Sequence, residues 1–379
     1  MTTTEETILF SVPCRAPNAP GNLAAVINSD HVHGDGPFTK SATEKLVALT
    51  GSEHVLLTTS GTAALEMAVR LLGVGPGYEV IVPSFTFSSG AASIVAAGGI
   101  PVFVDIEGET GNIDPALVEA AITPKTKAIS VMHYGGVPVD MDAIMAISRM
   151  HNIPVIEDNA HGLAVSSQYG RLGTIGAVAI QSFHDTKNVH CGEGGAVLIN
   201  DPALVEAAEI MREKGTNRSR FLRGQVDKYT WVEWGSSFLP SELNAAVLDA
   251  QLDEFDQIQE KRFAIWNTYK TELAGWAAEH SAQLMSPPDG VHAAHVFYVL
   301  MPNQVKRDAL LSHLRENGVI GTFHYVPLHS SPAGEKYGRV HGSMEKTDSF
   351  SGRLARLPLW PGMSDEQVKR VLDTMKSFQ

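Results

Sequence analysis

Cysteine is scarce in this chain. Only Cys14 and Cys191 occur among 379 residues, which is too few for a disulfide framework and typical of a reducing compartment. Long apolar runs are also missing, because no uninterrupted apolar stretch of about 18 residues exists that could span a membrane. The polar, acidic start at 1–6 lacks the basic and apolar regions of a signal peptide. We therefore expect a cytoplasmic protein that does not insert into a membrane.

Basic charge is in deficit as well. The chain carries 29 Lys and Arg against 42 Asp and Glu, a net charge of −13, which argues against binding to nucleic acid or to an anionic membrane. The sequence contains no GxxxxGK(S/T), no HExxH and no Cys and His spacing typical of a metal site, so we expect no metal. The glycine-rich stretch 73–77 precedes a predicted strand, whereas a dinucleotide-binding fingerprint follows one, so we interpret it as a turn.

What the chain does contain is a regular alternation of strand and helix patterns. Hydrophobic residues make up 44% of it, enough for a large buried core. The alternation predicts an α/β fold with a mostly parallel sheet covered by helices on both faces. Strands are predicted at 80–82, 102–104, 128–131, 154–156, 178–180 and 196–199, and helices at 41–49, 115–122 and 141–151.

The pattern also predicts two domains. Residues 1–240 would form a large domain that begins with an extended, Pro- and Gly-rich arm at 1–40. Residues 241–379 would form a bridging helix and a smaller C-terminal α/β domain. In this second part we expect a helix over 241–270, strands at 296–300 and 320–325, and helices at 305–317 and 364–378.

One lysine stands out by its position. Lys187 follows the predicted strand 178–180 and precedes the glycines of 192–195 and a further apolar strand. Lysine is seldom buried, and a desolvated lysine amine becomes a nucleophile toward carbonyl groups. Taken alone, the stretch fits a surface hairpin equally well. In parallel sheets, however, ligands bind at the carboxyl ends of the strands, and this rule selects Phe87, Asp158, His161 and Lys187 together.

These residue types fit one cofactor, pyridoxal phosphate. Lys187 would hold its aldehyde as a Schiff base, and Asp158 would keep the pyridine nitrogen protonated. Phe87 would stack on the ring. The phosphate would bind at the start of the predicted helix after Ser60, where free N–H groups and the helix dipole favour an anion; the residues there are Gly61, Thr62 and Ala63, joined by Ser182.

The segment 212–228 is locally basic. It holds six Lys and Arg against Glu213 and Asp227. A solvated helix end is one interpretation. A clamp for a diphosphate is the other, with Arg218 and Lys228 as cations and Tyr229 as a stacking surface for a base. The sequence leaves both open.

Four motifs, in order, resemble those of the DegT/DnrJ/StrS family of sugar aminotransferases. They are SGTAAL at 60–65, PSFTF at 83–87, VIEDNAH at 155–161 and SFHDTKN at 182–188. The resemblance covers about 13–359 and implies a pyridoxal-phosphate fold of type I, like that of aspartate aminotransferase. Stretches at 212–219, 223–231 and 323–329 most resemble the dTDP-4-amino-4,6-dideoxygalactose transaminase subgroup.

The resemblance implies more than the residues alone. It implies L-glutamate as amino donor, a nucleotide-linked 4-keto-6-deoxy sugar as acceptor, dTDP as the nucleotide, and a homodimer whose active sites draw on both subunits. A 3-aminotransferase or a dehydratase of the same family is the alternative, although dehydratases carry histidine where Lys187 stands. The family pattern gives cofactor contacts to Thr62, Ala63, Phe87, Asp158, His161, Ser182 and Lys187, and we add Arg218, Lys228, Tyr229, His324 and His329 as candidate substrate contacts.

One departure from the family pattern concerns the partner subunit. Many members carry an asparagine that reaches the partner's phosphate, whereas Leu239 stands at that point here. Ser236 or Ser237 is our candidate replacement.

Overall fold

The computed structural model of the chain describes residues 6–379, and its centre is an eight-stranded sheet. Every strand pairing from β8 (Val178–Ser182) to the far edge at β12 (Arg339–Val340) is parallel, and β9 (Gly195–Ile199) is antiparallel to both of its neighbours. The predicted mostly parallel α/β sheet is confirmed. The strands, in spatial order, are β1 (Val55–Thr58), β9 (Gly195–Ile199), β8 (Val178–Ser182), β5 (Val155–Asp158), β4 (Thr126–Met132), β2 (Glu79–Pro83), β3 (Ile100–Val104) and β12 (Arg339–Val340).

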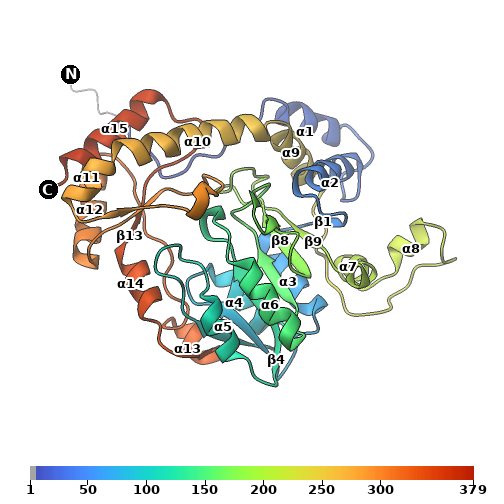
Figure 1. The fold of residues 1–379 in the computed structure, drawn as a ribbon. Helices are drawn as coiled ribbons and strands as arrows, with labels where there is room; N and C mark the ends of the chain where they lie inside the picture. The colour runs from blue at the N-terminus through green and yellow to red at the C-terminus, as the bar shows by residue number, and fades with distance from the viewer. Residues whose placement is uncertain (1–5) are drawn as a thin grey trace.

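Helices bury both faces of this sheet (Figure 1). Successive residues of a strand point to opposite faces, so Val80 and Val82 pack on one side and Ile81 on the other. This explains why the strands are apolar throughout rather than alternating. The first side is covered by α3 (Gly61–Leu71), α4 (Ser88–Ala96) and α7 (Val205–Arg212), and the second by α5 (Pro115–Ala121), α6 (Met141–His151), α2 (Pro37–Thr50) and α9 (Glu242–Asp253).

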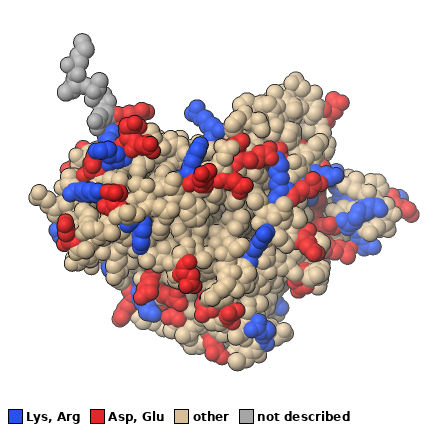
Figure 2. All heavy atoms as spheres, turned by 45° about the horizontal axis from the view of Figure 1, so that its top comes forward, with Lys and Arg blue, Asp and Glu red and all other residues tan. Residues whose placement is uncertain are grey.

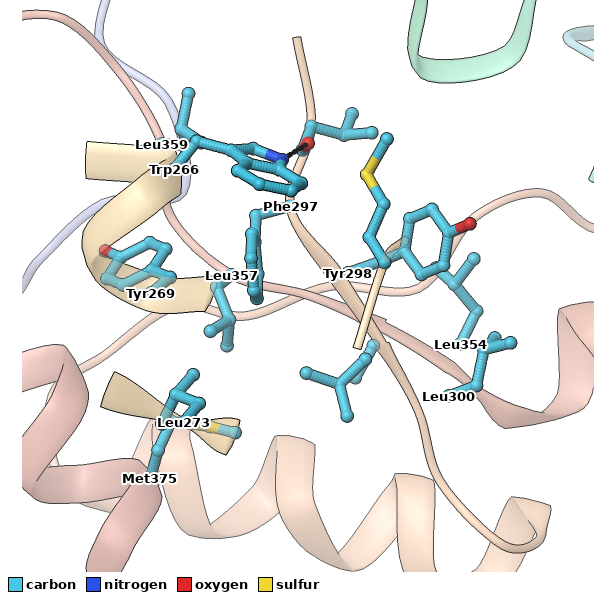
Figure 3. Packing of buried hydrophobic residues seen from close by; sticks show 14 of the residues in the cluster. Trp266, Tyr269, Leu273, Phe297, Tyr298, Leu300, Leu354, Leu357, Leu359 and Met375 are labelled. Carbon is cyan, nitrogen blue, oxygen red and sulfur yellow. Dashed lines mark hydrogen bonds between the residues drawn. The ribbon is translucent and has the colours of Figure 1, made fainter. Parts of the chain in front are cut away.

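The C-terminal part has a core of its own. A three-stranded antiparallel sheet of β10 (Gln283–Leu284), β11 (Tyr298–Leu300) and β13 (Leu354–Arg356) packs against α10 (Phe255–Glu272) and α15 (Asp365–Ser377). Figure 3 shows the large apolar side chains of this cluster, with the Trp266 indole N–H donating to the carbonyl of Val296 at 3.1 Å. The remaining elements are α1 (Ala19–Ile27), β6 (Ser166–Ser167), β7 (Gly170–Arg171), α8 (Arg218–Leu222), α11 (Ala274–Glu279), α12 (Gln304–Glu316), α13 (Pro332–Tyr337) and α14 (Glu345–Arg353).

The predicted division near residue 240 stays a prediction. The C-terminal part also reaches back to the large sheet, because β12 pairs with β3 at its edge.

The extended arm predicted for 1–40 is wrong for much of its length, although its residues 1–5 lie outside the described residues. Residues 19–27 form α1, whose Val26 is buried and whose Asn22 donates to the carbonyl of Ala246 at 3.2 Å. The prediction took the Pro- and Gly-rich composition of this segment as a sign of turns. Both Pro20 and Pro37 sit in the first turn of a helix, where no intrahelical partner for the missing N–H is needed.

Two predictions for the C-terminal part also need correction. No strand forms at 320–325, because the backbone partners of this segment are divided: Ile320 donates to Ile8, and only Thr322 pairs with Arg356. The helix predicted over 241–270 is two helices, α9 and α10, which meet at Glu254. The strand predicted at 296–300 and the helices at 305–317 and 364–378 are confirmed as β11, α12 and α15, with small shifts at their ends.

Among the described residues, no helix combines the length and the apolar character needed to cross a membrane.

Candidate active site

A cavity of about 350 Å³ opens where the carboxyl ends of β5 and β8 meet the start of α3. The segments that line it are far apart in the sequence, from Phe10 near the N-terminus to Leu359 near the C-terminus. Eight of the predicted site residues line it: Gly61, Thr62, Phe87, Asp158, His161, Ser182, Lys187 and His324.

The side chains of Lys187 and Asp158 shift each other's pKa through the attraction between their charges. Burial lowers the pKa of the Lys187 amine from 10.5 to about 8, the nearby Asp158 opposes this change, and the charge of Arg356 reinforces it. Burial raises the pKa of the Asp158 carboxyl, against the opposing effects of the Ala160 N–H and the Lys187 charge. The amine therefore loses its proton far more readily than an exposed lysine, and the neutral amine is the form that attacks an aldehyde.

The start of α3 presents free N–H groups to the cavity. Ser60 caps the helix with its side chain, which accepts from the N–H of Ala63 at 3.0 Å, and its carbonyl accepts from Ala64. Within the described residues, no hydrogen bond uses the N–H groups of Gly61 or Thr62. Two unsatisfied donors at a helix N-terminus form a site for an anion such as a phosphate. The N–H of Ala63 already donates to the Ser60 side chain, and Ala63 does not line the cavity.

Close backbone packing shapes this anion site. A Cβ at Gly61 would lie 2.8 Å from the Cβ of Ser182, and one at Gly195 would lie 2.5 Å from the Ser60 carbonyl. Glycine is therefore required at both positions. Sequence reasoning missed one member of this site, Ser89 at the start of α4, whose hydroxyl lies 2.7 Å from that of Thr62 and which lines the cavity.

Aromatic rings occupy two walls of the cavity. Phe87 precedes α4 with 55% of its surface exposed, which leaves its ring available for stacking. On another wall, the His161 ring stacks on His295 at 4.0 Å, and its Nδ1 accepts the N–H of Gly135. Burial holds the pKa of His161 well below its ordinary value, so the ring is neutral and carries its proton on Nε2.

His324 belongs to the same aromatic group. Its Nδ1 lies 3.1 Å from the hydroxyl of Tyr134, and its ring contacts that of Tyr325. Burial lowers the pKa of His324 and raises those of both tyrosines. The group is therefore uncharged. Sequence reasoning did not find Phe10, Arg262, His295, Tyr325 or Arg356, which also line the cavity.

The other predicted substrate residues lie outside the cavity. His329 is bound to the end of β2, where its Nδ1 is 2.8 Å from the Ser84 hydroxyl, and its Nε2 lies 3.5 Å from Asp348. Arg218, Lys228 and Tyr229 belong to α8 and the following loop, which extend away from the sheet at the right of Figure 1.

Most of the basic charge in segment 212–228 is neutralised within the chain. Arg212 and Arg218 pair with Asp35, Arg220 with Glu206, and Arg223 with Glu209. Figure 2 shows acidic and basic side chains interspersed on this projecting part, at the right of the view. Within residues 6–379, Lys228 has no ion pair and remains exposed. No group of three or more His, Cys, Asp or Glu in the described part of the chain could hold a metal ion.

Comparison with known proteins identifies the family of the chain. The model of the DegT/DnrJ/EryC1/StrS aminotransferase family matches residues 14–376. The chain belongs to that family. It is 34% identical over 355 residues to the spore coat polysaccharide biosynthesis protein SpsC of Bacillus subtilis (strain 168), with 90% of each protein covered. Among solved structures it is similar to the aminotransferase TlmJ from Streptoalloteichus hindustanus, with a TM-score of 0.89, 29% identity and 98% of each chain covered.

A third relative bears on the cofactor. The putative sugar aminotransferase Spr1654 from Streptococcus pneumoniae has been solved in its PLP form, with a TM-score of 0.88, 26% identity and 98% of each chain covered, and also in its PMP form. The chain is a pyridoxal-phosphate-dependent aminotransferase of fold type I. Its own residues fit the cofactor: the free N–H groups of Gly61 and Thr62 suit the phosphate, Asp158 the ring nitrogen, and Lys187 the aldehyde.

Proposed function

We infer that this enzyme transfers an amino group from L-glutamate to the C4 keto carbon of a nucleotide-linked 4-keto-6-deoxy sugar. We propose dTDP as the nucleotide and synthesis of a surface polysaccharide or glycan as the purpose. The observation that carries the proposal is the buried Lys187, opposite Asp158 and beside the free N–H groups of α3. The names of the relatives, a polysaccharide biosynthesis protein and a putative sugar aminotransferase, support a sugar acceptor.

Each of several cavity residues would have its own role in the reaction. The bound cofactor supplies an electron sink for the carbon that loses its proton. Lys187, with a pKa near 8, would take that proton from the donor's α-carbon and return it on the acceptor side. Asp158 would keep the ring nitrogen charged, Phe87 would cover the ring face, and neutral His324 would donate to or accept from sugar hydroxyls.

We further propose a homodimer in the cytoplasm with shared active sites. The projecting segment 212–231 supports this, because its substrate candidates Arg218, Lys228 and Tyr229 lie outside their own cavity. Tyr229 and Trp231 are 55% and 76% exposed, which is unusual for large aromatic side chains outside an interface. In a dimer this segment would enter the partner's cavity and place Lys228 against the nucleotide diphosphate, while Ser236 or Ser237 would reach the partner's cofactor phosphate.

Mixed dimers test the shared site. Lys187→Ala and Lys228→Ala, each inactive as a homodimer, are unfolded together and refolded, or co-expressed. If sites are shared, the hybrid contains one site with both lysines, and roughly a quarter of wild-type activity returns at equal mixing. No recovery from a verified hybrid would mean that Lys228 acts on its own subunit or not at all. Sedimentation measures the oligomeric state directly.

A substrate panel tests the reaction. Purified holoenzyme is given glutamate and one of several dTDP- and UDP-linked keto sugars, and product structure is read by NMR. We expect a 4-amino-4,6-dideoxy product from a dTDP-linked 4-keto sugar. A 3-amino product from a 3-keto sugar would replace the proposal with the 3-aminotransferase alternative, and loss of a hydroxyl without amination would indicate a dehydratase.

A further inference from the structure

Side chains on one face of α10 bind the backbone of a short segment beside the cavity. Gln259, Arg262 and Trp266 follow one another at steps of three and four residues, which places them on the same face of the helix. Together they donate to the four successive carbonyls of 293–296, over distances of 2.7–3.2 Å. Within this segment Ala294 has a φ of 45°, a left-handed conformation that is unfavourable for alanine. The hydrogen bonds from α10 therefore hold the segment in a shape that it would not keep by itself.

His295 is the residue of this segment that reaches the reacting part of the site. Its ring lines the cavity and stacks on that of His161, with the ring centroids 4.0 Å apart. Its Nδ1 lies 2.9 Å from the side-chain oxygen of Asn188. Burial lowers the pKa of His295 well below its ordinary value, and the charge of Lys187 acts in the same direction. The ring is therefore neutral, and because an amide oxygen only accepts, its proton is on Nδ1.

Asn188 connects this histidine to the lysine. It follows Lys187 directly in the chain and is buried. Its amide nitrogen donates to the side-chain oxygen of Gln259 at 2.7 Å and to the carbonyl of Ala293 at 2.9 Å, which leaves its oxygen to accept from His295. Among residues 6–379, no hydrogen bond or ion pair uses the amine of Lys187. The position of this lysine is therefore set through its backbone and the neighbouring asparagine.

We propose that His295 is a positioning residue, which holds Asn188 and thereby keeps Lys187 where its amine reaches the cofactor aldehyde. This rests on the proposed role of Lys187 as the lysine that binds the cofactor. The segment 293–296 is fixed by α10, and the Nδ1 proton of His295 completes the hydrogen bonds of Asn188. The stack on His161 is a separate contact that uses the ring face. The hydrogen bond and the stack can therefore be removed one at a time.

Two substitutions at His295 separate these contacts. His295→Asn keeps an N–H donor at the position of Nδ1 and loses the ring, whereas His295→Phe keeps a ring and loses the donor. Each cofactor-free protein is mixed with pyridoxal phosphate. Capture joins the Lys187 nitrogen to the aldehyde carbon and releases one water, and visible absorbance follows its rate. We expect capture to be about tenfold slower in His295→Phe, the factor that corresponds to one hydrogen bond, and within about threefold of wild type in His295→Asn.

Binding of pyridoxamine phosphate shows whether the effect is one of positioning. This form of the cofactor has no aldehyde and makes no bond to Lys187, so its affinity depends on the phosphate and ring contacts alone. We expect His295→Phe to bind it with wild-type affinity. Equal losses of affinity and capture rate in His295→Phe would mean a loosened cavity and overturn the proposal. A wild-type capture rate in folded His295→Phe overturns it too, as does equally slow capture in His295→Asn.

Asn188→Ala provides a second route to the same test. It removes the acceptor of the His295 hydrogen bond and should also slow capture about tenfold, and adding His295→Phe to it should slow capture no further. Additive losses in the double variant contradict the proposal. Circular dichroism and thermal unfolding show which variants keep the fold, so the test stands on either residue.

Two controls complete the experiment. His280→Phe makes the same substitution at a histidine that stacks on Trp276, contacts two backbone carbonyls and does not line the cavity, so both measurements should stay at the wild-type level. Lys187→Met separates the two levels of the argument. If it still captures pyridoxal phosphate in a form that borohydride fixes to the protein, the role of Lys187 itself fails. If it captures none while His295→Phe captures at the wild-type rate, only the positioning role of His295 fails.

Discussion

Replacing Lys187 by methionine should stabilise the cofactor-free protein. Lys187 is buried in the cavity, and burial lowers its pKa from 10.5 to about 8. Below pH 8 the amine is charged in both the folded and the unfolded chain, so the folded chain bears the full cost of desolvating that charge. A pKa difference of this size corresponds to about 3 kcal/mol. Methionine has a similar length and no charge, so Lys187→Met removes this cost.

The pH dependence of the effect has a definite sign. Between pH 8 and 10.5 the folded lysine is already neutral while the unfolded one still binds a proton, so the stability of the wild type rises with pH. The advantage of Lys187→Met should therefore shrink from about 3 kcal/mol at pH 7 to about 1.4 kcal/mol at pH 9.5. Urea unfolding of the two cofactor-free proteins at these pH values measures it.

Lys40→Met is the control for that measurement. The Lys40 side chain is 80% exposed and its nearest carboxylate, Glu44, lies 4.0 Å away, so its removal should change stability by less than about 0.5 kcal/mol at either pH. If Lys187→Met is no more stable than wild type at pH 7, or if its advantage grows with pH, the lysine is not held as a desolvated amine. The argument for Lys187 as a nucleophile poised near neutral pH would then lose its physical basis.

Three further substitutions test other parts of the structure. Gly61→Ala places a Cβ 2.8 Å from Ser182 and should weaken cofactor binding at least roughly tenfold, measured by absorbance titration, whereas Gly75→Ala, with nothing within 4 Å, should not. Asp158→Asn removes the buried carboxylate and should lower the rate of the glutamate half-reaction on the order of a hundredfold, in a protein that still captures the cofactor. Glu242→Gln affects the fold alone: its carboxylate accepts from the backbone of Gly36, Phe38 and Thr39 at the start of α2, so unfolding in urea should show a loss of about 2–4 kcal/mol with unchanged cofactor affinity once folded.

The reacting part of the site could be predicted from the sequence because it follows a rule of parallel sheets. Asp158 and Ser182 end neighbouring strands, β5 and β8, and the carboxyl ends of such strands meet at one edge. The strands themselves were recognisable because both faces are buried, which makes them apolar throughout. Lys187 lies in the loop that follows β8. Its position near Asp158 could therefore be predicted without knowing any contact between distant parts of the chain.

The remainder of the site depends on contacts that no local pattern records. Phe10 and Arg356 come from opposite ends of the chain and meet only because the N-terminal segment is bound to Val319 and Trp360. The sequence left two interpretations of the basic segment 212–228 open for a related reason. Counting charge within a window missed Asp35, Glu206 and Glu209, acids that lie outside the window and neutralise its arginines.

The charges of the cavity suggest why the protein needs its ligands to be complete. Lys187, Arg262 and Arg356 bring three cations to a cavity whose lining holds two carboxylates, the buried Asp158 and the exposed Glu193, and the surrounding histidines and tyrosines stay neutral. The cofactor phosphate is an anion, and the free N–H groups at the start of α3 are placed to bind it. Binding of the phosphate therefore gives hydrogen-bond acceptors to donors that the fold leaves without a partner.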